Sequence, residues 1–141
     1  MKKEIFDDYI ARFNRRDATG FDQYISPNMK MQNGGLVFYG AEGMKDHYKN
    51  KIWPTFREEL HVERFFSDEE NVAIEMWAHF TAERDDPQSL FGPVKKGETF
   101  DYRGVILYKV ENGKFTDIKV SYLSFIRTGL DGKQINLGLP H

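Results

Sequence analysis

The sequence predicts an α+β fold in which helices of the N-terminal half pack against a curved antiparallel sheet. In the first 56 residues, apolar side chains recur mainly at intervals of three and four, which is typical of helices. After Arg57 the interval shifts to two, as in strands. Turn signals such as Asn112-Gly113 separate the later strands. Helices followed by a meander of strands indicate the α+β class.

Three helices are expected. The opening segment, residues 5–13, carries one apolar stripe. A short second helix around Phe21 ends before Pro27, because proline disfavours helix in the residue that precedes it. A third helix begins at Ala41 and extends toward Phe56. Three helices cover one face of a sheet, so the other face is expected to meet water or a second subunit.

The strands follow from short alternating runs. They are expected at residues 29–32, 36–39, 60–66, 72–83, 100–110 and 115–127. The tail from Thr128 holds three Gly and one Pro, and we expect it to pack loosely. The chain is therefore interpreted as a single domain over residues 1–141, with its core at about 3–127 and a C-terminal tail at 128–141.

Composition narrows the function classes. The chain has 141 residues, of which 40% are hydrophobic and 30% charged, which favours a globular protein. It has no cysteine, so thiol catalysis and cysteine-bound metals are excluded. With a net charge of −2, we expect no nucleic-acid partner. The charged start and the lack of a long apolar run indicate a cytoplasmic protein with no membrane partner.

The last two long strands indicate what the inner face of the sheet is made of. Even-numbered positions carry mostly apolar residues and a few phenols, whereas the charges fall on odd positions. An apolar wall with few hydroxyls suits a pocket for a small apolar molecule, although a packed core without a pocket fits the pattern equally well. The aromatic residues of the opposite face favour a homodimer that packs through the sheet.

The run from Asp101 to Phe115, with its Arg-Gly-apolar start and its Asn-Gly-Lys turn, resembles the SnoaL-like branch of the nuclear-transport-factor-2-like superfamily. The opening helix and the order of elements fit it too, over about residues 3–127. Ketosteroid isomerases and polyketide cyclases belong to this group. The resemblance implies a cone-shaped sheet around a pocket, commonly in a homodimer, and chemistry without a cofactor.

The resemblance also implies roles for single residues. Tyr9 matches the first-helix tyrosine of ketosteroid isomerases, which donates to the oxyanion; a packed core ring is the alternative. Asn33 lies where the isomerases have their basic Asp, Ile106 where they have a second acid, and Val120 near an Asp of the cyclases. These departures argue against ordinary ketosteroid isomerisation. Asn33 is expected either to orient a ligand or only to form the turn with Gly34.

Other side chains complete the candidate site. His47 on the third helix and His79 on a central strand are candidate bases, and the pattern leaves open which sheet face holds His79. Trp53 is a candidate pocket wall, while Tyr108 and Tyr122 are candidate hydrogen-bond donors. The four histidines form no motif with metal-ligand spacing, so no metal site is expected.

The sequence thus predicts a small enzyme that needs no cofactor. It would move protons on an apolar carbonyl or hydroxyl compound, as an isomerase, a cyclase or a dehydratase, which is a lyase. Tyr9 would stabilise the oxyanion, and His47 or His79 would be the base. The alternative is a non-catalytic ligand-binding or dimerisation domain of the same fold, which the missing carboxylates favour.

Overall fold

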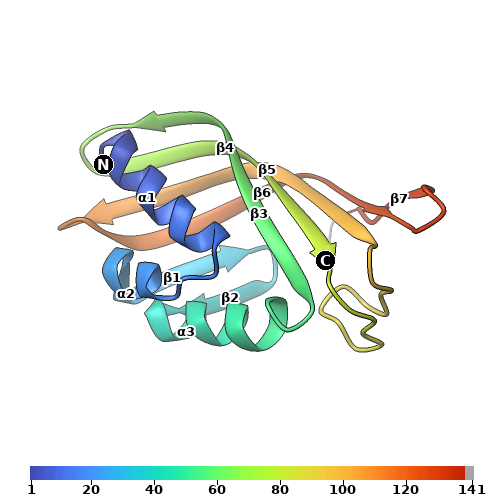
Figure 1. The fold of residues 1–141 in the computed structure, drawn as a ribbon. Helices are drawn as coiled ribbons and strands as arrows, with labels where there is room; N and C mark the ends of the chain where they lie inside the picture. The colour runs from blue at the N-terminus through green and yellow to red at the C-terminus, as the bar shows by residue number, and fades with distance from the viewer. Residues whose placement is uncertain (139–141) are drawn as a thin grey trace.

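The computed structural model describes residues 1–138, in which three helices pack against the concave side of a curved, seven-stranded sheet (Figure 1). The helices are α1 (Lys3–Asn14), α2 (Thr19–Tyr24) and α3 (Gly40–His47), and a π-helical turn (Tyr48–Ile52) continues α3. The strands are β1 (Ile25–Asn33), β2 (Leu36–Tyr39), β3 (Phe56–Ser67), β4 (Asn71–Ala82), β5 (Thr99–Glu111), β6 (Lys114–Thr128) and β7 (Gln134–Asn136). The α+β cone predicted from the sequence is confirmed.

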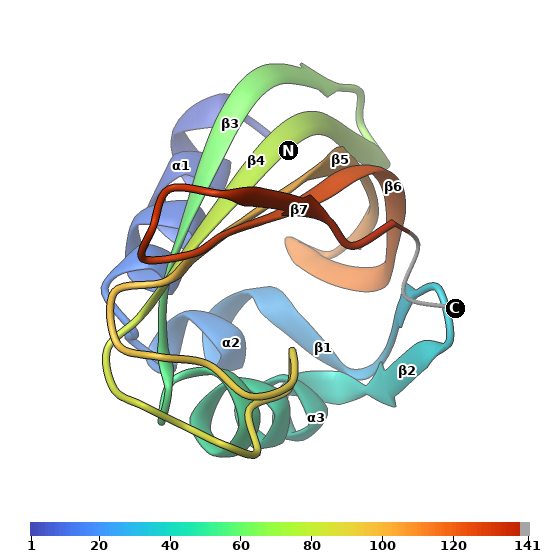
Figure 2. The ribbon, with the colours of Figure 1, turned by 90° about the vertical axis from the view of Figure 1, so that its right-hand side faces the viewer.

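The sheet is mixed rather than purely antiparallel. Its order is β2-β1-β6-β5-β4-β3, with β7 paired to the end of β6. The pair β1–β6 is parallel, and every other pair within residues 1–138 is antiparallel. A parallel pair needs a long crossover, and here β2, α3 and β3 to β5 supply it. Figure 2 shows β3 to β6 arching over one side, with β1, β2 and α3 opposite.

Helix α1 buries the predicted stripe except Ile5, which is 44% exposed. Phe6, Tyr9, Ile10 and Phe13 are its buried residues. The ring of Phe6 lies 5.3 Å from that of Tyr108 on β5, in an edge-to-face arrangement. Burying a side chain of this size contributes roughly 1.5–3 kcal/mol. The stripe therefore anchors α1 on the sheet and points Tyr9 toward the interior.

Strand β3 begins earlier than the sequence predicted, because the preceding helix ends at Ile52 instead of extending toward Phe56. The π-helical turn ends the helix just before Pro54, which cannot continue it. As a result Phe56, Glu58 and Leu60 share the buried face of β3. This shift brings a carboxylate into the interior.

A bulge in β6 changes which side chains point inward. Gly104 pairs with Tyr122 and Arg103 with Ser124, so Leu123 is an extra residue. Ile118 and Val120 face inward, as the even positions were predicted to, but Phe115, before a second register shift, and Phe125, beyond Leu123, are inward at odd positions. The predicted inward facing of Ser124 was therefore wrong, since one inserted residue reverses the alternation.

The side chains of the tail from 130 to 137 are exposed, as the expected loose packing implies, but its backbone is paired. Strand β7 pairs with the last residues of β6, and the backbone N–H of Leu137 donates to the carbonyl of Phe125 at 2.8 Å. Backbone pairing needs no apolar pattern, which explains why composition alone indicated a loose tail. Residues 139–141 lie outside the described part of the chain.

Candidate functional site

The helices and the inner sheet face line an open-mouthed cavity of about 340 Å³. This volume lies in the range of small-molecule sites. Its wall is mainly apolar, with Phe13, Ile52, Met76 and Phe80 among the lining residues. The cavity that the inner-face pattern suggested is therefore present, and the interior is not packed solid.

The most unusual lining residue is Glu58, which sequence analysis missed. Its side chain is only 8% exposed and faces the cavity from β3. Burial raises the pKa of this carboxyl from 4.5 to about 8, because the apolar wall disfavours its charge. The available signal was the pattern Phe56-x-Glu58-x-Leu60, in which an acid takes an apolar position of a strand.

Three phenols accompany Glu58 in the cavity wall. Tyr9 comes from α1, Tyr48 from the π-helical turn and Tyr108 from β5. Burial raises the pKa of each phenol, and the charge of Glu58 raises it further. All three therefore remain protonated donors at neutral pH. We call Tyr9, Tyr48, Glu58 and Tyr108 the acidic end of the cavity.

His47 also lines the cavity, with its side chain 6% exposed. Its ring stacks on Phe38, with the centroids 5.1 Å apart. Burial, helped by the charge of Lys51, lowers the pKa of His47 to about 4, so the ring is neutral at pH 7. Within residues 1–138 its Nδ1 atom is buried and finds no hydrogen-bond partner. His47 thus offers a ligand a neutral imidazole and is a weak base.

Asn33 lines the cavity at the end of β1. The Tyr102 hydroxyl donates to Asn33 Oδ1 at 3.2 Å. In the sheet register Asn33 pairs with Val120, and Val120 pairs with Ile106. All three positions, where the resemblance suggested acids in related enzymes, therefore form one row of the cavity wall. Asn33 supplies the only side-chain polar group of that row.

Three predicted site residues lie elsewhere. His79 is on the outer face of β4, where its Nδ1 lies 2.6 Å from an Asp101 oxygen, because odd positions of β4 face outward. Trp53 follows the π-helical turn and stacks on Phe21 at 6.1 Å instead of lining the cavity. Tyr122, next to the bulge, is likewise outside the lining, although its ring lies 6.0 Å from that of Tyr102.

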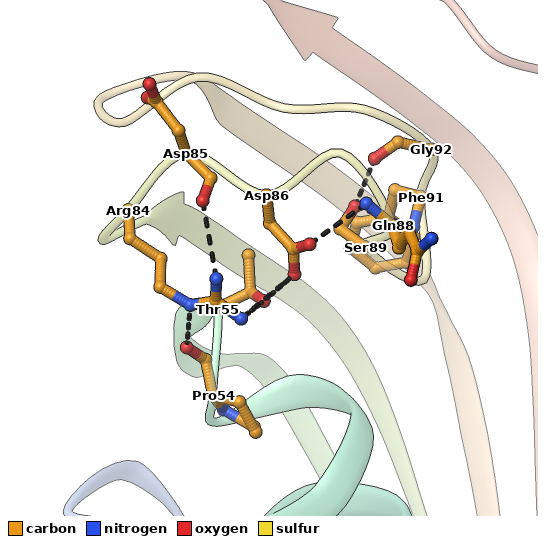
Figure 3. A network of polar contacts seen from close by, with 9 residues as sticks. All are labelled: Pro54, Thr55, Arg84, Asp85, Asp86, Gln88, Ser89, Phe91 and Gly92. Atoms are coloured by element: carbon orange, nitrogen blue, oxygen red, sulfur yellow. Dashed lines mark hydrogen bonds and ion pairs between the residues drawn. The ribbon is translucent and has the colours of Figure 1, made fainter.

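The loop between β4 and β5, residues 83–98, covers one side of the cavity with Leu90 and Phe91. Arg84 and Asp86 hold this loop on the turn that precedes β3 (Figure 3). Arg84 Nε donates to the Pro54 carbonyl at 2.7 Å, and the Thr55 hydroxyl donates to Asp86. The Phe91 ring then packs on several inner-face rings, including that of Phe56 at 4.9 Å.

Within residues 1–138, no group of three or more His, Asp or Glu side chains is arranged to hold a metal ion. None of the helices described is both long enough and apolar enough to cross a membrane.

The fold and the cavity together define a class of protein, the α+β cone that encloses a space of small-molecule size. The sequence matches the SnoaL-like domain family over residues 6–118. The chain therefore belongs to the SnoaL-like family. The family resemblance predicted from the 101–115 segment is confirmed. No match was found among the curated proteins.

Solved structures agree on the fold. One is described as a putative polyketide cyclase from Xanthomonas campestris pv. campestris; it is 18% identical, covers 85% of this chain and 88% of its own, and has a TM-score of 0.71. The Δ5-3-ketosteroid isomerase from a Mycobacterium species is 14% identical over 94% of this chain and 95% of its own, with a TM-score of 0.66. A computationally designed 17-OHP binder is 16% identical, with the same coverages and TM-score. At these identities the likeness shows the fold alone.

Proposed function

We propose that this protein is a cofactor-independent enzyme that moves a proton on an apolar carbonyl compound bound in the cavity. The observation that carries this proposal is the buried Glu58 carboxyl, which faces an apolar cavity beside the Tyr9 phenol. A carboxyl buried without a basic partner costs stability, and such groups cluster at functional sites. Its pKa of about 8 suits proton transfer near neutral pH.

Glu58 acts as the base. Its carboxylate takes a proton from the carbon next to the ligand carbonyl, and the C–H electron pair forms the new carbon–carbon double bond of an enolate. Tyr9 donates a hydrogen bond to the enolate oxygen, which carries the developing charge. The protonated Glu58 no longer repels that charge, and it returns the proton to another carbon of the ligand. The product is an isomer, so atoms and electrons balance.

The remaining cavity residues bind the substrate. Tyr108 is a second donor at the acidic end, while Ile106, Val120 and Asn33 contact the body of the ligand. His47 offers its neutral ring to a ligand hydroxyl. The base that the sequence predicted at His47 or His79 is thus replaced by Glu58, because a pKa of about 4 weakens His47 and His79 lies outside the cavity. A cyclase or dehydratase would need the same acid–base group.

The test uses a β,γ-unsaturated cyclohexenone, whose isomerisation to the conjugated enone is followed by ultraviolet absorbance. We expect the wild-type protein to form the enone, with kcat/KM rising with pH toward a plateau above about 8. Glu58→Gln and Tyr9→Phe should each lower the rate by roughly 10²–10³-fold. Glu59→Gln is the matched control, because Glu59 is the next residue of β3, lies outside the cavity lining and has a side chain that is 41% exposed.

A wild-type rate in Glu58→Gln, or no enone from the wild-type protein, would contradict the proposal. If the wild-type protein bound a naphthol, an enolate mimic, without turning over the enone precursor, the second candidate would replace the first. That candidate is a non-catalytic ligand-binding domain. It is favoured by the apolar Ile106 and Val120 and by the neighbouring fold described as a 17-OHP binder.

We also propose that the chain, as one SnoaL-like unit, forms a homodimer through the outer sheet face. Leu107 on β5 and Leu123 on β6 are 53% and 61% exposed on this face. Trp77 on β4 is on the same face, paired with Arg103, whose guanidinium lies 4.6 Å above its ring. These exposed leucines and this ring are groups that a subunit interface would bury. The expectation of a cytoplasmic location stays a prediction.

A further inference from the structure

The loop between β4 and β5 carries two apolar residues at its tip, which the proposed reaction does not use. Ser89 to Gly92 form a tight turn, in which the Gly92 N–H donates to the Ser89 carbonyl at 3.0 Å and the Ser89 hydroxyl donates to the Gly92 carbonyl (Figure 3). Leu90 and Phe91 occupy the two corner positions of this turn, where polar residues and glycine are usual. Both side chains line the cavity. We call residues 87–92 the tip of the loop.

Both legs of the loop are clamped to the body of the protein. The first leg is held by the hydrogen bond from Thr55 to Asp86. The second leg is held by Arg127 on β6, whose Nη2 donates to the Pro93 carbonyl at 3.0 Å. Asp86 and Val94 also exchange two backbone hydrogen bonds, of 3.0 Å and 2.9 Å, which join the legs just below the tip. The base of the loop is therefore fixed.

The tip, in contrast, has no hydrogen bond to the body of the protein. Among the described residues 1–138, every hydrogen bond made by residues 87–92 has its partner within residues 86–92. Side-chain packing holds the tip down, because the Phe91 ring lies against four inner-face rings at centroid distances of 4.9 to 5.1 Å. These rings are Phe56, Phe80, Phe100 and Phe125. The tip can therefore move away without breaking a hydrogen bond to the body.

The tip also forms part of the rim of the cavity mouth. Of the lining residues that the structure describes, only Gly35 and Leu90 are exposed, so they mark where the cavity opens. Leu90 is 47% exposed although it borders an apolar space. Closing the tip over an apolar ligand would bury more of this side chain, which is favourable. An outward movement of the tip would widen the mouth.

We propose that the tip is a gate, which swings outward as one unit on its clamped legs to admit a ligand and then closes over it. Phe91 is the latch, because its ring must leave the four surrounding rings before the tip can open. Gly92 suits the hinge, since it has a φ of 87° and a Cβ atom there would meet nothing within 4 Å. The inference rests on the proposed function only in treating the cavity as the ligand site.

The first experiment measures the motion itself by nitrogen relaxation dispersion of the backbone amides, which detects exchange on the microsecond-to-millisecond timescale of loop gates. We expect the amides of residues 88–92 to exchange at one shared rate, whereas those of Asp86 and Val94 in the legs do not. Phe91→Ala should raise the ratio of open to closed tip at least about 10-fold, because it removes the ring packing. Phe65→Ala is the matched control, since Phe65 is also a partly buried ring packed on the core but lies outside the cavity lining.

The second experiment measures access to the cavity. Because the chain has no cysteine, Ala78→Cys places a single thiol in the cavity wall, at a position that is 5% exposed in the wild-type protein. Dithiodipyridine reacts with this thiol and releases thiopyridone, whose ultraviolet absorbance gives the rate. Adding Phe91→Ala should raise this rate at least about 10-fold, whereas adding Phe65→Ala should leave it unchanged. Met76→Cys, at the neighbouring inward position of β4, is a second reporter, and thermal unfolding checks that each variant folds.

The outcomes separate this inference from the proposed function. The gate is overturned if residues 88–92 show no exchange, if the legs exchange equally, or if Phe91→Ala raises the thiol rate no more than Phe65→Ala does. Neither measurement involves Glu58 or enone formation. A protein that shows the shared exchange of the tip but forms no enone keeps the gate and loses the proposed reaction. A protein that forms the enone with a motionless tip does the reverse.

Discussion

Glu58 is a carboxyl that folding moves out of water into a wall of apolar side chains and phenols. In the unfolded chain its pKa has the ordinary value of 4.5, whereas in the folded protein it is about 8. The folded state therefore binds this proton more tightly, and its stability falls as the pH rises from 4.5 to about 8. His47 acts in the opposite direction, because its lowered pKa removes stability as the pH falls from 6.5 to about 4. Between pH 6.5 and about 8, only Glu58 of these two groups makes the folding stability depend on pH.

We predict that Glu58→Gln stabilises the protein above neutral pH. The wild-type protein should lose about 2 kcal/mol of unfolding free energy relative to Glu58→Gln between pH 6.5 and about 8, because unfolding the wild-type protein there releases the proton of Glu58. Urea unfolding at several pH values measures this difference. Glu59→Gln should follow the wild-type curve; parallel curves for Glu58→Gln and wild type would show that Glu58 titrates normally.

The residue scale also shows where sequence reasoning reached the site. Tyr9 could be predicted as a cavity residue, because three-and-four spacing determines which side of a helix is buried. Glu58 could not be ranked above the other acids, because its burial depends on where the preceding helix ends. The sequence left undecided which sheet face holds His79. The burial pattern of β4 in the structure places it on the outer face.

At the scale of elements, the bulge between β5 and β6 decides what the inner face carries. It places Leu123 outside and Phe125 inside, and it brings two backbones close together at Gly104. A Cβ atom on Gly104 would lie 2.3 Å from the Ser121 carbonyl oxygen. Glycine is required there because the contact is with backbone, which cannot rotate away.

We predict that Gly104→Ala destabilises the protein by about 1–3 kcal/mol, the usual cost of forcing an extra carbon into packed structure. The fold must either open the β5–β6 pairing or displace the bulge. Gly35→Ala is the control, since a Cβ atom there meets nothing within 4 Å. Urea unfolding of both variants is the measurement, and equal stability of the two would mean that the bulge tolerates a side chain.

At the scale of the whole molecule, the curved sheet has two different faces. The concave face is covered by the helices and holds the cavity, while the convex face leaves Leu107 and Leu123 exposed. Large apolar side chains exposed on a sheet face are useful where a second subunit covers them. The proposed ligand site and the proposed dimer contact would thus lie on opposite sides of one sheet.

We predict that sedimentation equilibrium gives twice the mass of one chain at micromolar concentration. Leu107→Lys and Leu123→Lys should shift the protein toward the monomer, because each places a charge in the apolar contact. Leu130→Lys, at an exposed leucine of the tail, should leave the mass unchanged. A single-chain mass for the wild-type protein would contradict the dimer.

The sequence by itself determined the helix stripe that carries Tyr9, the change from helices to strands, the hairpin at Asn112-Gly113 and the family. These features depend on neighbouring residues, so periodicity and turn chemistry are enough to find them. Only the tertiary structure decided the parallel β1–β6 pair, the bulge at Leu123 and the inward position of Glu58. Each of these depends on segments that are distant in the chain, because pairing register and burial are set by the partner strand and not by the strand's own pattern.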